Sequence, residues 1–230
     1  IHGNGNQNKK IIFNNLFVII YLKTWNPTYD YIRPKISYNS KKIFIFIFLK
    51  EDIDIIEFLT NIVNINYDKK NIIYYVYNNQ NYDLSILSQY NLIEDKISNT
   101  EYEVRDKSLK ICKIYNCDYY FNIDTECFLE TPEILNDLIS YDKNIIAPLF
   151  KKDDHWSNFW GDINYNGWYN KSFNYYDIIN YKHKGCWNVP YINHIYLIKT
   201  SIIDNLNDFY SLNYVKNKGC DMSFCENCPL

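Results

Sequence analysis

Residues 43–49 form an unbroken apolar run in which isoleucine alternates with phenylalanine before a final leucine. A run without polar positions is typical of a strand buried on both faces, as in a parallel sheet covered by helices. A chain of 230 residues is long enough to bury such a strand inside one large domain. We therefore expect an α/β fold in which this strand is buried.

Segments with helical and strand-like patterns alternate after this run. Apolar residues at helical spacing predict helices, and β-branched or aromatic runs predict strands. The alternation indicates a mainly parallel central sheet flanked by helices, as in Rossmann-like folds. In chain order we expect helix 54–65, strand 72–77, helix 104–114, strand 119–123, a helix starting at Thr131-Pro132-Glu133, strand 145–150 and strand 191–199.

The composition is that of a folded chain and excludes some partners. Apolar residues make up 47% and charged residues 22%, which is typical of globular proteins. The formal net charge of −3 gives no overall attraction to nucleic acid or anionic membranes, so we expect no nucleic-acid partner. The apolar run 11–22 is interrupted by Asn14 and Asn15 and is shorter than the ~20 residues that cross a bilayer.

Two acidic residues follow the strand expected at 119–123. They belong to the sequence Asp124-Thr125-Glu126 and are separated by one residue. In an open α/β sheet ligands bind at the carboxyl ends of the strands, and paired carboxylates there can hold a hard divalent cation. Such a cation could neutralise the diphosphate of a nucleotide sugar. A solvated strand end without metal is the alternative, and the pattern alone leaves both open.

Tryptophans gather in the segment between residues 156 and 191. Trp156, Trp160 and Trp187 stand in aromatic, glycine-containing sequences. Indole rings can stack on sugars or bases, or they can fill a core. Core packing is the commoner use, so we expect residues 156–160 to be mostly buried, while the sugar-binding alternative stays open.

The chain has seven cysteines, and structural thiols, some of them paired in an oxidising compartment, explain them best. Cys220, Cys225 and Cys228 are close in sequence, but a zinc site needs four ligands and no histidine is near them. His194 falls within the apolar strand expected at 191–199. We expect it to be a hydrogen-bonded core residue rather than a metal ligand.

Several segments together resemble the procollagen lysyl hydroxylase/glycosyltransferase family, the procollagen-lysine 2-oxoglutarate 5-dioxygenases. The resemblance is to the second glycosyltransferase-like domain of that family and covers residues 42–225 in order and spacing. A six-residue block with two tryptophans, 156–161, is its most specific part. The matching segments are 117–121 with Ile123-Asp124, 145–149, 156–161, 187–191, 196–199, and Asp221-Met222 with Cys225.

The resemblance implies a GT-A-like accessory domain between a sugar-transfer domain and a hydroxylase domain. Residues 1–41 would be the tail of the upstream glycosyltransferase domain and a linker, and residues 42–230 the accessory domain, truncated at its C-terminal end. By the same resemblance His2 is a manganese ligand of the upstream domain and Asn4 lies beside its sugar donor. Because the chain does not start with methionine, we expect a fragment.

The resemblance also makes Asp124 and Glu126 candidate manganese ligands, as a vestige of the family's acidic motif. The family usually carries Asp-Ala-Asp here, and Glu126 adds a methylene that would shift the metal geometry. A GT-A enzyme also uses a later histidine ligand, and we expect the chain to end before supplying one. We therefore expect an incomplete metal site and no sugar transfer by the isolated fragment.

For the parent protein the resemblance implies an enzyme that hydroxylates lysines of collagen-like chains and glycosylates the hydroxylysine. It would use a UDP-sugar and, in its hydroxylase domain, iron, 2-oxoglutarate and ascorbate. The implied partners are collagen-like chains, the flanking domains and a second copy in a homodimer. Animal relatives imply the endoplasmic reticulum lumen. Two alternatives for this segment stay open: an active metal-dependent UDP-sugar glycosyltransferase, or a module that binds collagen or carbohydrate.

Overall fold

The computed structural model describes residues 40–205 except 52–53, 98–99, 152–155, 166–167 and 184. The chain divides into two compact units, which are described separately. The sheet unit comprises Arg33–Pro148 and His194–Asp204, and the aromatic unit includes Leu149–Asn193. Some residues that the sequence analysis named lie outside the described part of the chain. They are His2, Asn4, Cys220, Asp221, Met222, Cys225 and Cys228.

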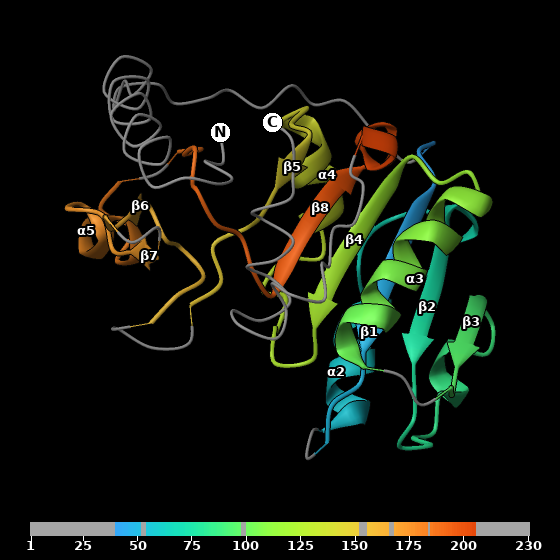
Figure 1. The fold of residues 1–230 in the computed structure, drawn as a ribbon. Coiled ribbons are helices and arrows are strands. Elements are labelled where there is room, and N and C mark those ends of the chain that lie inside the picture. Colours follow the sequence, from blue (N-terminus) through green and yellow to red (C-terminus); the bar gives the residue numbers. More distant parts are fainter. Residues whose placement is uncertain are drawn as a thin grey trace. The chain divides into compact units, whose positions relative to one another are not determined.

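The sheet unit is built on a six-stranded sheet with the strand order β3-β2-β1-β4-β8-β5 (Figure 1). The four neighbouring strands β3, β2, β1 and β4 are parallel to one another. Strand β8 runs antiparallel to both β4 and β5. The mainly parallel α/β fold expected from the sequence is therefore confirmed. The strands are β1 (Ile43–Phe48), β2 (Ile72–Tyr77), β3 (Asn91–Asp95), β4 (Tyr119–Asp124), β5 (Ile145–Ile146) and β8 (Ile195–Lys199).

Strand β1 lies inside the sheet, as its unbroken apolar sequence predicts. It pairs in parallel with β2 on one side and β4 on the other. Its first five residues are completely buried, which requires cover on both faces. Aromatic rings also pack across neighbouring strands: the centroid of Phe46 is 5.9 Å from that of Tyr75 and 6.0 Å from that of Tyr120. Side-chain burial therefore holds these three strands in register.

Helix α3 covers one face of the sheet (Figure 1). It begins at Glu101, three residues earlier than the apolar pattern predicts. The backbone N–H and the hydroxyl of Thr100 both donate to Glu103, which fixes this start. No helix in the described part of the chain is long and apolar enough to span a membrane. The helices are α2 (Ile55–Val63), α3 (Glu101–Ile114), α4 (Ile134–Ser140) and α5 (Tyr175–Ile179), with 3-10 turns η1 (Lys69–Asn71), η2 (Ser85–Leu87) and η3 (Thr200–Asn205).

Three further predicted boundaries differ from the observed ones, each for a local reason. Strand β5 stops at Ile146 instead of residue 150, because Pro148 has no N–H for a sheet hydrogen bond. Strand β8 starts at Ile195 instead of residue 191, because His194 adopts a left-handed φ of 62°. Helix α4 starts at Ile134 rather than at residue 131. The Thr131 hydroxyl accepts from the Glu133 N–H in the turn before it.

Strand β3 was not expected from the sequence, and its last residue ties three elements together. The carboxylate of Asp95 accepts from the Tyr75 hydroxyl at 2.5 Å and from the Lys107 ammonium at 2.6 Å. It also accepts from the Ile97 N–H at 3.0 Å. Burial raises the pKa of Asp95, but the hydrogen bonds from Lys107 and Tyr75 outweigh it and lower the pKa below its ordinary value.

We expect Asp95→Asn to lower the free energy of unfolding by about 1.5–3 kcal/mol at neutral pH, because charged hydrogen bonds are lost. A carboxylate with a lowered folded-state pKa stabilises above its unfolded pKa of about 3.9 and loses that effect as the pH falls. The difference from wild type should therefore shrink in urea denaturation at about pH 3. Asp106→Asn, which removes an exposed pair with Lys110, should cost under about 0.5 kcal/mol. A gap that persists in acid contradicts the assignment.

The aromatic unit has its own small core. Strands β6 (Asp162–Ile163) and β7 (Tyr169–Asn170) form an antiparallel pair, and α5 follows them. Buried Phe159 packs with Tyr175, Ile178 and Ile179 from α5. Partly buried Leu149, Trp187 and Val189 pack against this cluster. The unit therefore has an apolar centre supplied by residues that are separated in the sequence.

Candidate functional site

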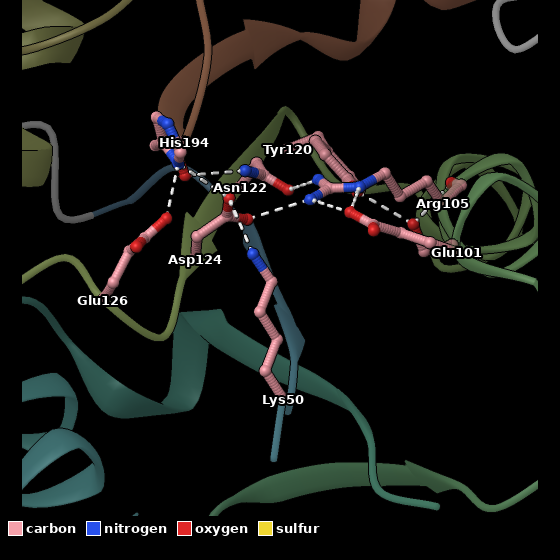
Figure 2. Close-up of polar contacts among 9 residues, drawn as sticks. Lys50, Glu101, Arg105, Tyr120, Asn122, Asp124, Glu126 and His194 are labelled. Carbon is pink, nitrogen blue, oxygen red and sulfur yellow. Dashed lines mark hydrogen bonds and ion pairs between the residues drawn. The ribbon is translucent and has the colours of Figure 1, made fainter. Parts of the chain in front are cut away.

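Asp124 is the last residue of β4, where the sequence predicted it (Figure 2). Strand β4 lies between β1 and β8, so its carboxyl end is in the middle of the sheet. Only 2% of Asp124 is exposed, and Asn122, two residues earlier on the same strand face, is completely buried. A buried carboxylate is costly unless other groups stabilise its charge.

Arg105 of α3 provides most of that stabilisation. Its guanidinium donates to Asp124 Oδ1 at 2.9 Å and to Asn122 Oδ1 at 2.6 Å. Two further hydrogen bonds reach Glu101 Oε1, at 2.9 Å from Nε and 2.8 Å from Nη2. Only 1% of the Arg105 side chain is exposed, so this is a buried ion pair between a helix and a strand. Figure 2 shows the guanidinium lying between the helix and the strand end.

His194 approaches Asp124 from the other side. Its ring Nδ1 lies 3.1 Å from Asp124 Oδ2 and 3.0 Å from Glu126 Oε1. Ionised carboxylates only accept hydrogen bonds, so Nδ1 carries the hydrogen between them. The His194 backbone oxygen accepts from both the Asn122 amide and the Asp124 N–H, each at 2.9 Å. The left-handed turn at His194 therefore fixes both its backbone and its ring against β4.

Lys50, just beyond β1, adds a second positive charge. Its ammonium lies 3.9 Å from Asp124 Oδ2, and the Lys50 side chain is 40% exposed. Burial by itself raises the pKa of Asp124, but Arg105, the hydrogen bond with His194 and Lys50 together hold that pKa well below its usual range. We call the group of Lys50, Glu101, Arg105, Asn122, Asp124, Glu126 and His194 the Asp124 cluster.

Asp124, Glu126 and His194 could together hold a metal ion. One ligand atom from each lies within 4.8 Å of the others, which gives two oxygens and one nitrogen. The sequence was not expected to supply a histidine to this site, and the structure places His194 beside the two acids. The donor types suit a divalent cation such as manganese. However, a metal on Nδ1 must displace the hydrogen held there, and Asp124 already has a guanidinium partner. The three residues therefore supply donor atoms of the right type for a divalent cation, but two of those atoms already have hydrogen-bond or ion-pair partners.

The predicted aromatic residues lie in the aromatic unit. Trp156 is half-buried and packs edge-on against Phe150, with centroids 5.8 Å apart. Trp160 is also half-buried, and Trp187 packs edge-on against Phe159 at 6.2 Å. Between the two tryptophans of block 156–160, all three residues are buried. The block therefore contributes to a core, and its two indole rings are only partly covered.

Sequence reasoning missed Arg105 and assigned His194 to a strand. A signal for Arg105 was present, because it shares the stripe formed by Ser108, Leu109 and Cys112 on α3. An arginine followed by small or apolar residues three, four and seven positions later lies on the buried face of a helix. Such an arginine indicates a buried charge that needs a partner. No comparable signal marked His194, since its role depends on one turn of the backbone.

A family model described as "Glycosyltransferase family 25, N-terminal domain" matches residues 88–216. The chain is 42% identical over 114 residues to "Procollagen lysyl hydroxylase and glycosyltransferase" of Acanthamoeba polyphaga mimivirus, which covers 48% of this chain and 13% of that protein. It is 30% identical over 183 residues to human "Procollagen-lysine,2-oxoglutarate 5-dioxygenase 1", covering 74% and 25%. The chain thus spans a quarter or less of the length of these relatives.

Two solved glycosyltransferases share the fold. One is the mannosyltransferase PcManGT from Pyrobaculum calidifontis in complex with GDP-Man and Mn²⁺, with a TM-score of 0.55, 12% identity and coverage of 94% of this chain and 57% of that one. The other is S. aureus TarS in complex with UDP, with a TM-score of 0.54, 13% identity and coverage of 80% and 54%. At these identities the likeness shows a GT-A fold alone.

Proposed function

This chain belongs to the procollagen lysyl hydroxylase/glycosyltransferase family, and on that basis we propose that it is part of a larger protein that modifies lysines of collagen-like chains. The names of its relatives support this, because they describe oxidation of procollagen lysine. In such a protein the described residues form a glycosyltransferase-like domain. The hydroxylation, with iron, 2-oxoglutarate and ascorbate, would take place elsewhere in the parent.

Within that protein we assign the segment an accessory role rather than sugar transfer. The observation that supports this is the buried ion pair between Arg105 and Asp124, at 2.9 Å. The Arg105 guanidinium already balances the negative charge of Asp124, which a metal ion at the end of β4 would otherwise use. Removing a buried guanidinium from its carboxylate is costly, so a cation has to bind beside this pair rather than in place of it.

The charges of the cluster support the same role. Three carboxylates, those of Glu101, Asp124 and Glu126, face the two permanent positive charges of Arg105 and Lys50. Without a bound cation the cluster has no excess of positive charge, so it does not by itself attract the diphosphate of a nucleotide sugar. The cluster by itself therefore favours a structural link between α3 and β4.

A second candidate, divalent-dependent binding of a nucleotide sugar, is favoured by the arrangement of Asp124, Glu126 and His194. Their three donor atoms lie within 4.8 Å of one another. Bound there, a divalent cation would neutralise a diphosphate leaving group. Glu126 would be the easiest ligand to recruit, because its side chain is 42% exposed and Arg105 does not bind it in the described contacts.

Calorimetric titration of Mn²⁺ and then of a UDP-sugar into the chain separates the two candidates. We expect weak Mn²⁺ binding and no measurable donor binding, because Arg105 already pairs with Asp124 and the cluster has no excess of positive charge to attract a diphosphate. Glu126→Gln is the suitable variant, since Asp124 is too deeply buried to change without affecting the fold. Exposed Glu130→Gln is the matched control. Micromolar donor binding that needs Mn²⁺ and is lost only in Glu126→Gln would show an active donor site.

A further inference from the structure

Asn170, the last residue of β7, begins a triplet of the kind that accepts N-linked oligosaccharides. The triplet is Asn170-Lys171-Ser172, in which a hydroxyl residue follows the asparagine by two positions. Elsewhere in the chain this spacing occurs only in Asn26-Pro27-Thr28, where the middle proline excludes it. Asparagine is abundant in this chain, so such a triplet also arises by chance. The fold around Asn170 decides whether it can carry a glycan.

The fold places Asn170 on the surface of the aromatic unit. Strands β6 and β7 form a hairpin, whose turn is closed by a hydrogen bond of 2.7 Å from the Asn164 N–H to the Trp168 carbonyl. Asn170 is exposed, and its side-chain oxygen accepts from the Lys171 N–H at 2.9 Å. Its amide nitrogen donates to no group in the described part of the chain. A glycan on that nitrogen would therefore break no hydrogen bond of the described residues.

The hydroxyl of the triplet, in contrast, is held inside the unit. The Ser172 hydroxyl donates to Asn174 Oδ1 at 2.7 Å. A Cβ added to Gly161 would lie 2.6 Å from Ser172 Oγ, so the backbone of Gly161 packs closely against it. Because a transferase recognises this hydroxyl as part of the triplet, it has to act before the unit folds. In the folded protein only the acceptor nitrogen needs room, and exposed Asn170 provides it.

We propose that Asn170 is a site of N-linked glycosylation, which takes its oligosaccharide from a lipid-linked oligosaccharide diphosphate. The Asn170 Nδ2 forms a bond with the anomeric carbon of the first sugar, and the bond between that carbon and the diphosphate oxygen breaks. The lipid diphosphate leaves, and Nδ2 gives up one proton to the transferase. The site belongs to the aromatic unit and uses no residue of the Asp124 cluster, so its test stands apart from the titration above.

Trp168 offers the first sugar of this glycan a surface to pack on. It precedes Asn170 by two residues in the second arm of the hairpin, and side chains two residues apart on a strand lie on the same face. Trp168 is 45% exposed. An indole ring presents an apolar face to the C–H groups of a sugar ring. The glycan would therefore cover aromatic surface that otherwise contacts water.

Expression of the whole chain behind a cleavable secretory leader in eukaryotic cells tests the site directly. We expect the protein recovered from the secretory compartments to carry one oligosaccharide, which mass spectrometry places on peptide 153–171 and peptide-N-glycosidase removes. Asn170→Gln should abolish the modification. Asn180→Gln is the matched control and should keep it, because Asn180 is exposed in the same unit but starts no such triplet. Wild-type chain without a glycan, or a glycan that persists in Asn170→Gln, would overturn the proposal.

Thermal unfolding read by tryptophan fluorescence tests the packing on Trp168. The unglycosylated reference is Asn170→Gln made with the same leader. Enzymatic removal of the glycan is unsuitable, because it leaves an aspartate at position 170, opposite Asp162 in the hairpin. The glycosylated wild type should have a Tm about 2 °C above the reference, because the indole gains an apolar contact. Trp168→Ala should still be glycosylated but should lose this difference. An equal difference with and without Trp168 would overturn the packing.

Discussion

Arg105→Met should lower the free energy of unfolding of the sheet unit by about 3–5 kcal/mol, the cost of breaking a buried ion pair from one side. The methionine keeps much of the volume but leaves the Asp124 carboxylate buried without the guanidinium. Asn122 and Glu101 lose hydrogen-bond donors at the same time. Urea denaturation followed by far-ultraviolet circular dichroism measures the change, since the sheet and α3 dominate that signal.

Two matched variants separate the buried pair from its exposed surroundings. Lys50→Met removes the charge that lies 3.9 Å from Asp124 and is 40% exposed, so it should cost about 1 kcal/mol or less. The double variant Arg105→Met with Asp124→Leu should recover a large part of the loss, because neither charge is left unpaired. If Arg105→Met is as stable as wild type, the ion pair does not hold α3 to β4 and the accessory role loses its main support.

The sequence predicted the middle of the sheet better than its edges. Strands β1, β2 and β4 are covered on both faces, so their burial leaves an unbroken apolar signal. Edge strand β3 is polar and partly exposed, and its sequence Asn91–Asp95 gives no such signal. Its position follows from parallel pairing with β2, which only the folded chain reveals.

The candidate site was predictable only where it depends on a local pattern of the sequence. Asp124 ends an apolar strand, and a strand end in a parallel sheet is a local property of the sequence. Arg105 and His194 lie 19 and 70 residues away from it along the chain. Their meeting depends on the packing of α3 on the sheet and on the turn before β8. No local pattern of the sequence encodes these two contacts with Asp124, so they could not be predicted from a single sequence.

Phe159→Ala should destabilise the aromatic unit by about 3–5 kcal/mol, because it opens a cavity between α5 and the tryptophan segment. Phe159 is 8% exposed and packs against Tyr175 and Trp187, with centroids 6.3 and 6.2 Å away. Tryptophan fluorescence is the appropriate signal. Four of the five tryptophans of the chain lie in Leu149–Asn193, whereas residues 40–148 contain none.

The matched control for this change is Phe173→Ala, since Phe173 belongs to the same unit and is 83% exposed. An exposed ring contributes little to a folded core, so the control should shift the fluorescence transition by less than about 0.5 kcal/mol. A large shift for Phe159 with a small one for Phe173 assigns residues 156–160 to the core. Equal small shifts, together with weaker binding of a collagen-like peptide, would instead favour a ligand-binding aromatic surface, which is the alternative that the tryptophan-rich sequence leaves open.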